Sequence, residues 1–190
     1  MLSSRHALKE WNATCRALAE GRQIILLRKG GLLDEDGVFT LEQSAFWMLP
    51  TAFHQGPHLL KKEHLDLLDE STFKPHLPGD DLNLQLFATV AKVWALDENA
   101  EEALANLPHI WTNAYLDGRW SYKPDHPLLC VALRIYQDTQ SHHIPTSPSY
   151  FGCRSWIDLP EELASSHSEP LLNNAEFAER LNAIEMVLGD

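Results

Sequence analysis

The stretch GRQIILLRKGG, residues 21–31, contains the clearest secondary-structure signal in the chain. Its four consecutive apolar residues predict a buried strand that is apolar on both faces and therefore central in a sheet. Arg28 and Lys29 follow these apolar residues directly, and Gly30 and Gly31 end the strand. The stretch thus places two cations and two flexible residues at the end of a core strand, although the chain has a formal net charge of -12.

Helices and strands are expected on both sides of this stretch. Apolar residues recur at helical spacing over residues 5–20, which predicts an N-terminal helix. The remaining expected elements are strands over 22–29, 45–49, 82–96 and 127–136, helices over 57–70, from Asn99 and from Asn174, a hairpin over 115–120, and loops over 72–81 and 138–149. Residues 82–96 are apolar at both odd and even positions, so a helix stays the alternative there.

These elements do not alternate regularly as strand and helix. The fold class is therefore expected to be α+β rather than doubly wound α/β. We expect a small mixed or barrel-like β-sheet of four to six strands, with N-terminal, central and C-terminal helices. At 190 residues the chain fits a single domain, residues 1–190.

The composition indicates a cytoplasmic protein. The three cysteines are Cys15, Cys130 and Cys153; they form no disulfide framework and no CxxC pair. No apolar run approaches the roughly 20 residues of a membrane helix, and the N-terminus lacks the apolar region of a signal peptide. No membrane partner is therefore expected.

Charge is distributed unevenly along the chain. Residues 1–62 hold eight Lys/Arg and six Asp/Glu, so they carry a net +2, and the rest of the chain carries -14. An acidic protein is a poor general binder of nucleic acid, because affinity for phosphates requires many cations. A small basic pocket in the N-terminal third is compatible with this distribution.

The first candidate site lies at the end of the strand over residues 22–29. Arg28 offers a planar fork of donors and Lys29 a point charge, so together they suit an anion or a base edge. Gly30 and Gly31 would let a ligand approach the backbone closely. The alternative is a strand that leaves the core into solvent, where cations and a glycine turn are expected without any ligand.

The second candidate site is PTAFHQG, residues 50–56, which also follows an expected strand. His54 can act as an acid, a base or a ligand near neutral pH. Gln55 carries both a donor and an acceptor, as recognition of a base edge requires. The alternative is a loop in which both side chains satisfy backbone groups. Two such loops after two strands can converge on one cleft.

Motifs for metals and cofactors are missing from the sequence. It contains no HExxH, no paired CxxC, no GxxxxGK[ST] loop and no GxGxxG fingerprint. Cys153 lies beside Arg154 and Trp156, but no nucleophile elbow accompanies it, so a packed cysteine is the better interpretation. We expect no metal and no cofactor.

Five segments together resemble a bacterial family catalogued only as a domain of unknown function. They are ALKEW (7–11), LLRKGG (26–31), FWMLPTAFHQ (46–55), PLLCVALRIY (127–136) and GCRSW (152–156). The resemblance spans nearly the whole chain and implies no activity. It adds Lys9 and Glu10 to the candidate binding residues, because these two polar residues lie in one of the matching segments.

The order of the expected elements is also similar, more loosely, to PUA-like domains that bind modified bases. This likeness implies a non-catalytic binding domain with a small basic pocket for a nucleobase, a nucleotide or a nucleic-acid end. One alternative is a phosphoester hydrolase or nuclease that uses Glu10, His54 and Lys29. Another is an acidic domain that binds a basic protein, although no protein partner can be named.

Overall fold

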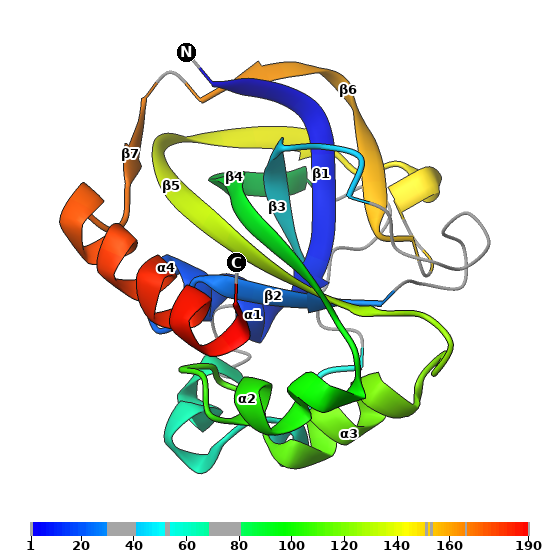
Figure 1. Cartoon of the computed structure of the whole chain (residues 1–190). Helices are drawn as coiled ribbons and strands as arrows, with labels where there is room; N and C mark the ends of the chain where they lie inside the picture. Colours follow the sequence, from blue (N-terminus) through cyan, green and yellow to red (C-terminus); the bar gives the residue numbers. More distant parts are fainter. Residues whose placement is uncertain are drawn as a thin grey trace.

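The strand that contains residues 25–28 lies at one end of a seven-stranded mixed sheet (Figure 1). The computed structural model describes residues 2–29, 41–51, 54–68, 81–150, 152, 154–165 and 167–189. The strands are β1 (Ser3–Trp11), β2 (Ile25–Arg28), β3 (Ala45–Thr51), β4 (Asp81–Leu96), β5 (Leu128–Pro145), β6 (Trp156–Ala164) and β7 (Ser168–Pro170). The hydrogen-bonded order is β2-β5-β4-β3-β1-β6, and β7 pairs with β5 outside this path.

The sheet is mixed because β1 and β3 run parallel while the other paired strands run antiparallel. The α+β class and the mixed sheet are thereby confirmed, with seven strands where four to six were expected. The position of β2 differs from the expectation of a central strand, since among the described strands β2 pairs with β5 alone. Both faces of β2 are nevertheless buried, which explains its apolar sequence.

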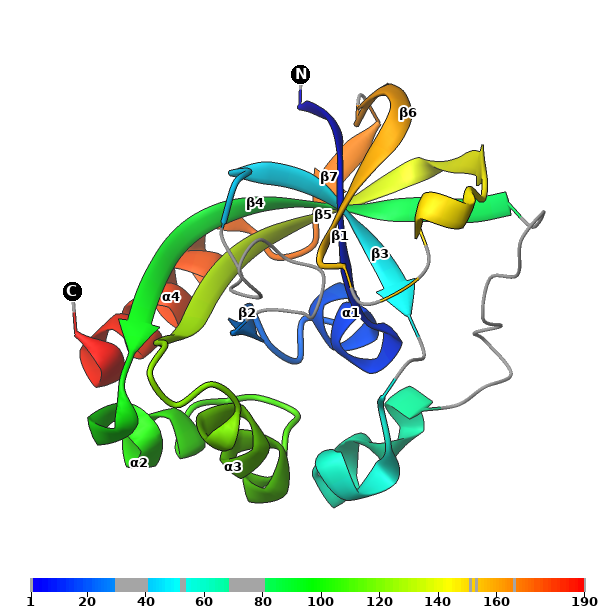
Figure 2. The ribbon, with the colours of Figure 1, turned by 90° about the vertical axis from the view of Figure 1, so that its right-hand side faces the viewer.

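Helices and short 3-10 turns connect and cover the strands. The α-helices are α1 (Asn12–Ala19), α2 (Glu101–Ala105), α3 (Asn113–Ser121) and α4 (Asn174–Leu188), and the 3-10 segments are η2 (Pro57–Leu59), η3 (Lys62–Leu68), η4 (Glu98–Ala100) and η5 (Pro148–Tyr150). Figure 2 shows α2 and α3 together below the sheet and α1 directly under β1. None of the helices in the described part of the chain is long and apolar enough to cross a membrane.

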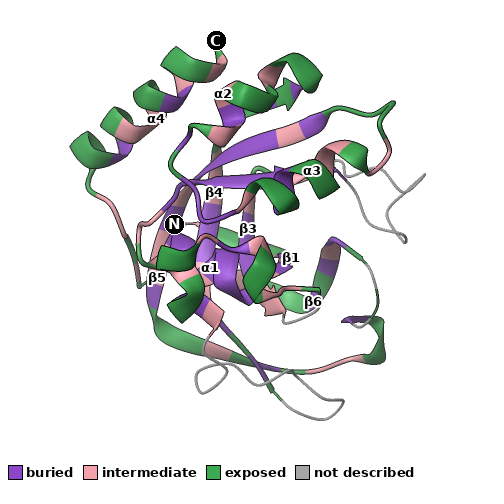
Figure 3. Cartoon of the chain, turned by 90° about the horizontal axis from the view of Figure 1, so that it is seen from below, coloured by how far each residue is buried: buried purple, intermediate pink, exposed green. Residues whose placement is uncertain are grey.

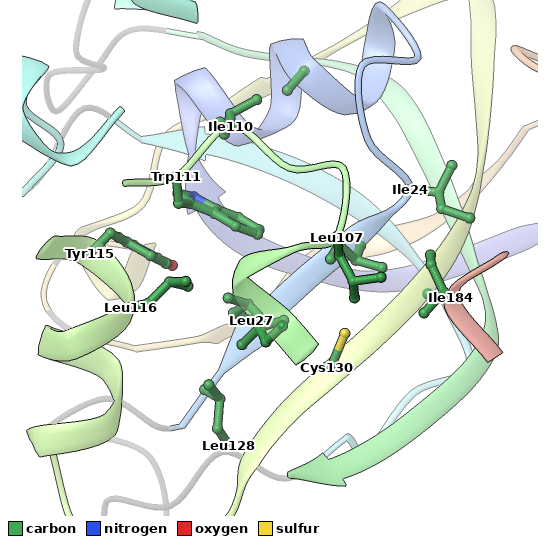
Figure 4. Packing of buried hydrophobic residues seen from close by; sticks show 14 of the residues in the cluster. Ile24, Leu27, Leu107, Ile110, Trp111, Tyr115, Leu116, Leu128, Cys130 and Ile184 are labelled. Carbon is green, nitrogen blue, oxygen red and sulfur yellow. The ribbon is translucent and has the colours of Figure 1, made fainter. Parts of the chain in front are cut away.

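The largest core cluster lies between one face of β2 and β5 and the helices below them. Ile25 and Leu27 belong to this cluster, whereas Leu26 packs into a second cluster on the other face of β2. Figure 3 shows the buried residues concentrated on the strands and on the inner sides of the helices. In Figure 4, Leu27, Trp111, Tyr115 and Leu116 lie together in the first cluster. The elements α2, α3 and α4 thus cover one face of the β2–β5 pair.

Several expected elements are confirmed. The strands over 22–29, 45–49, 82–96 and 127–136 correspond to β2, β3, β4 and β5, and the C-terminal helix begins at Asn174. The region from Asn99 is helical, and the side chain of Asp97 caps it by accepting a hydrogen bond from the backbone of Asn99. The helix alternative for residues 82–96 is excluded.

Other expectations are wrong. Residues 5–11 form most of β1, because this segment pairs with β3 on one side and β6 on the other, and these long-range partners outweigh the local helical spacing. The hairpin expected over 115–120 is the helix α3, and Gly118 lies inside it with open space around its Cα. The loop expected over 138–149 continues β5 to Pro145.

The helix expected over 57–70 consists of the two 3-10 segments η2 and η3 as far as Leu68. Leu60 lies between them and forms an isolated bridge with Trp111, so the chain is extended where an α-helix would continue. The expected loop over 72–81 lies outside the described residues, apart from Asp81, which begins β4.

Candidate functional site

A buried ion pair joins the ends of β1 and β2. Nη1 of Arg28 donates to Oε2 of Glu10 at 3.0 Å and to the Lys9 carbonyl oxygen at 3.3 Å. Nη2 of Arg28 donates to the Ser155 hydroxyl at 2.5 Å, and the other Glu10 oxygen accepts from the Trp11 backbone at 2.7 Å. The side chain of Glu10 is only 4% exposed and that of Arg28 13%. Both charges are therefore held in the interior by hydrogen bonds from several segments.

This pair closes a curve in the sheet. Three strands separate β2 from β1 along the hydrogen-bonded path, so the two strands meet only because the sheet curls. Arg28 of β2 contacts β1 through Lys9 and Glu10, and it contacts the segment before β6 through Ser155. We call Glu10 and Arg28 the Glu10–Arg28 pair.

Lys29, the residue after the end of β2, points away from the Glu10–Arg28 pair and toward α3. It is 3% exposed, and its Nζ donates to the carbonyl oxygen of Trp120 at 3.1 Å. The same Nζ lies 5.9 Å from the centre of the Trp120 ring. Burial lowers the pKa of Lys29 from its ordinary value. Consecutive residues of an extended chain point to opposite faces, which explains why these neighbouring cations have different surroundings.

Aromatic side chains of β1 and α3 meet beside the Glu10–Arg28 pair. The rings of Trp11 and Tyr115 pack edge to face with their centres 5.0 Å apart, and Trp111 stacks on Tyr115 at 5.1 Å. Figure 4 shows Trp111 and Tyr115 lying next to each other. The guanidinium of Arg119 lies 4.8 Å from the centre of the Tyr115 ring. Polar and aromatic groups of separate elements therefore gather at one place.

The charges of this region act on one another. Glu10 interacts electrostatically with Arg119 and with Tyr115, and Arg28 also acts on Tyr115. Burial is the main cause that raises the pKa of Tyr115, so its phenol is uncharged at neutral pH. We use the name ring–cation site for Glu10, Trp11, Arg28, Tyr115 and Arg119.

The other candidate residues lie around this site in different roles. Nζ of Lys9 donates to the carbonyl oxygens of Tyr150 at 3.0 Å and Gly152 at 2.5 Å, so Lys9 fastens the segment before β6. The side-chain oxygen of Gln55 accepts from the Ala13 backbone at 3.2 Å, which satisfies one of the open N–H groups in the first turn of α1. Gln55 thus satisfies a backbone N–H group, as expected under the alternative interpretation of this loop.

His54 is exposed and adopts a left-handed backbone conformation with φ of 66°. Gly30 and Gly31 lie outside the described residues. The structure therefore brings Glu10 and Arg28 into direct contact, places Gln55 at the start of α1, and directs Lys29 and Lys9 elsewhere. A role of any of these residues in ligand binding stays a prediction.

A family profile for a domain of unknown function, DUF1802, matches residues 7–183. The chain belongs to this family. The match confirms the family resemblance of the five sequence segments. No curated protein matches the chain.

The DUF1802 chain is also similar to the crystal structure of ASCH from Zymomonas mobilis. The two are 12% identical in sequence with a TM-score of 0.43, and the similarity covers 94% of this chain and 93% of the other. A similarity of this degree carries no argument about function, and the looser likeness to PUA-like domains stays a prediction.

The ring–cation site contains residues that sequence reasoning missed. Tyr115 and Arg119 were placed in a hairpin because Asp117-Gly118 is typical of a turn. Their spacing of four residues puts them on one face of a helix, and this spacing was the signal that could have identified them. Trp11 falls within the helix expected over residues 5–20, whereas the structure places it at the end of β1.

A separate hollow of about 490 Å³ lies between α2 and α3. Its acidic lining residues are Glu98, Glu101, Glu102 and Asp117. Within the described part of this DUF1802 chain, no group of three or more His, Cys, Asp or Glu side chains could hold a metal ion. The acidic hollow and the ring–cation site involve the same helix, α3, but differ in charge.

Proposed function

We propose that this protein is a non-catalytic, cytoplasmic binding domain for a nucleobase, a nucleotide or a nucleic-acid end. The observation that carries the proposal is the gathering of Trp11, Tyr115 and Arg119 around the Glu10–Arg28 pair. Trp11 and Tyr115 supply flat rings and Arg119 supplies a forked donor, two kinds of contact that a nucleobase uses.

The charge of the ring–cation site supports an anionic ligand. Arg28 and Arg119 contribute two positive charges and Glu10 one negative charge, so the site carries a net +1 inside a protein of net charge -12. Burying a charge is costly unless it is paired. The net positive charge of the site therefore favours an anionic ligand over a cationic one, without the broad basic surface that the protein lacks.

The rings offer a place for a flat ligand. Trp11 is half-buried, and its ring packs edge to face against the buried Tyr115. Stacking of a base on an aromatic side chain contributes about 1–3 kcal/mol. Burial of the neighbouring Glu10 and Arg28 keeps these charges in fixed positions, which favours recognition of a defined base edge over unspecific attraction.

A binding titration tests the proposal directly. Fluorescence anisotropy or calorimetry would compare the four nucleoside monophosphates and short single strands of RNA and DNA at two salt concentrations. We expect Trp11→Leu to weaken binding by about tenfold, because it removes the stacking surface. Tyr136→Leu, which removes a half-buried ring elsewhere in the sheet, is the matched control and should bind as the wild type does.

Thermal unfolding of both variants would confirm that they fold. Failure of the wild-type protein to bind every nucleotide and strand would contradict the proposal. Equal binding by Trp11→Leu and the wild type would place the ligand elsewhere.

The hydrolase alternative receives less support from the geometry. Both oxygens of Glu10 already accept hydrogen bonds, one from Arg28 and one from the Trp11 backbone, so Glu10 would have to leave these partners to act as a base. Release of product from a nucleotide or strand in the presence of divalent metal would favour the enzyme.

A further inference from the structure

Two neighbouring donors at the junction of β2 and α3 are incompletely satisfied by the residues that the structure describes. Lys29 is 3% exposed, and within the described part of the chain it has no carboxylate partner. Its ammonium has three donors, and the Trp120 carbonyl oxygen accepts one of them at 3.1 Å. Lys29 is thus a buried cation whose charge is not neutralised by the residues that the structure describes.

The second donor is the indole nitrogen of Trp120. Its Nε1 is buried and has no hydrogen-bond acceptor among the described residues. Nζ of Lys29 lies 5.9 Å from the centre of this indole ring, so the two donors belong to the same small region. Buried polar groups in native proteins are normally hydrogen-bonded, and each exception calls for an explanation.

We propose that Lys29 and Trp120 form a subsite for a single phosphate group, the terminal phosphate of the ligand. The proposal rests on the proposed function, because it assigns the anionic end of the ligand that the ring–cation site would bind. A phosphate supplies one acceptor for the indole N–H and negative charge for the ammonium, so it would satisfy both donors at once.

The surroundings of α3 favour a single phosphate over an internal phosphate of a long strand. Asp117 lies three residues before Trp120 on α3, and it lines the hollow that also contains Glu98, Glu101 and Glu102. A strand that continued along α3 would bring further phosphates close to these carboxylates. Since charges of the same sign repel within about 10 Å at 0.1 M salt, the acidic hollow disfavours such an extension.

The phosphate increment, the ratio of the Kd of adenosine to that of AMP, tests this subsite. We expect the wild-type protein to bind AMP at least about tenfold more tightly than adenosine. Lys29→Met should abolish this increment, and Trp120→Phe, which keeps a ring but removes the N–H, should reduce it about fivefold. The affinity for adenosine should stay unchanged in both variants.

Lys62→Met, which removes an exposed cation from η3, is the charge-matched control and should keep the full increment. Thermal unfolding shows whether each variant folds. If Lys29→Met does not fold, the phosphate increment of Trp120→Phe still tests the subsite. An increment that is unchanged in both folded variants would overturn the subsite.

Inorganic phosphate separates this inference from the proposed function. Phosphate binding by the wild type that both variants lose would support the subsite even if no nucleoside or nucleotide bound, an outcome that would contradict only the proposed function. Absence of binding of both phosphate and AMP would overturn the subsite.

Ten-nucleotide strands with a 5′-phosphate or a 5′-hydroxyl distinguish the two sources of a terminal phosphate. Tighter binding of the phosphorylated strand, at an affinity near that of AMP, would identify a strand end. Binding of AMP alone would identify a free nucleotide. Equal binding of both strands would contradict recognition of a terminal phosphate.

Discussion

Arg28 and Lys29 are neighbours in the chain and carry the same charge, but they lie in two different environments. Arg28 points into the curl of the sheet and contacts Glu10, Ser155 and the Lys9 backbone. Lys29 points toward α3, where a carbonyl oxygen of Trp120 is its acceptor. The side chain of Arg28 is 13% exposed, and Lys29 as a whole residue is 3% exposed.

The difference separates a cation that a buried carboxylate balances from a cation that no described carboxylate balances. The Glu10–Arg28 pair connects β1, β2 and the segment before β6, and removal of either member would leave a buried charge. Lys29 connects β2 to α3 through one hydrogen bond and adds a positive charge that no described carboxylate balances. Two cations that are adjacent in a sequence can therefore have different electrostatic surroundings.

The largest loss of stability is expected when Arg28 loses its partner Glu10. Glu10→Gln should lower the free energy of unfolding by about 3 kcal/mol, because it leaves the buried Arg28 guanidinium without its counter-charge. Urea unfolding would measure the loss. Glu185→Gln is the matched control, since it breaks the more exposed Lys92–Glu185 pair of 2.9 Å and should cost at most about 1 kcal/mol. Similar losses in both variants would contradict a special role of burial.

The next prediction concerns the pH dependence of stability near α3, where His109 packs against Trp111. His109 is buried, and its Nδ1 accepts from the Trp111 backbone at 3.1 Å. Burial lowers the pKa of His109 from 6.5 to about 4. Above pH 6.5 the imidazole is neutral in both the folded and the unfolded chain. As the pH falls toward 4, only the unfolded chain binds the proton, so stability is lost.

This shift predicts that His109 alone lowers the free energy of unfolding by about 3 kcal/mol between pH 7 and pH 4. His109→Asn should remove this part of the pH dependence, and urea unfolding at a series of pH values would measure the difference between the two proteins. Parallel pH profiles for the variant and the wild type would show that His109 is readily protonated in the folded state.

The smallest effect is expected for Lys29. Lys29→Met keeps an unbranched side chain of similar volume and removes a buried charge, so the free energy of unfolding should stay within about 1 kcal/mol of the wild type. Urea unfolding beside Glu10→Gln makes the comparison direct. A loss as large as that of Glu10→Gln would show that Lys29 is a structural ion and would remove the distinction between the two cations.

The strands that the sequence predicts well are those with apolar residues on both faces. Residues 24–27 lie between two core clusters, and β4 and β5 pair along most of their length, so local composition already reflects burial. The segment 5–11 was misjudged because Ala7, Leu8 and Trp11 also fit a helical stripe. Only its pairing with β3 and β6, which lie far away in sequence, makes it a strand.

The candidate site also depends on contacts between residues that lie far apart in the sequence. The sequence indicates Glu10, Arg28 and Lys29 as polar residues in matching segments, but the partner of each cation depends on how the sheet curls and where α3 packs. The Asp117-Gly118 pair favoured a turn, although α3 accommodates Gly118 at an exposed helical position at a cost of about 1 kcal/mol relative to alanine. Tyr115, Arg119 and Trp120 were thereby separated from the site.

The pairing of β1 with β6 has a consequence for the order in which the protein is made. Ser3 lies opposite Ala164, so β1 leaves the ribosome long before β6, the strand that covers one of its edges. At 5–20 residues per second, this interval lasts about 10–30 s. Ser155, which accepts from Arg28, emerges only shortly before that strand. Glu10 and Arg28 therefore leave the ribosome well before the contacts that enclose them can be completed.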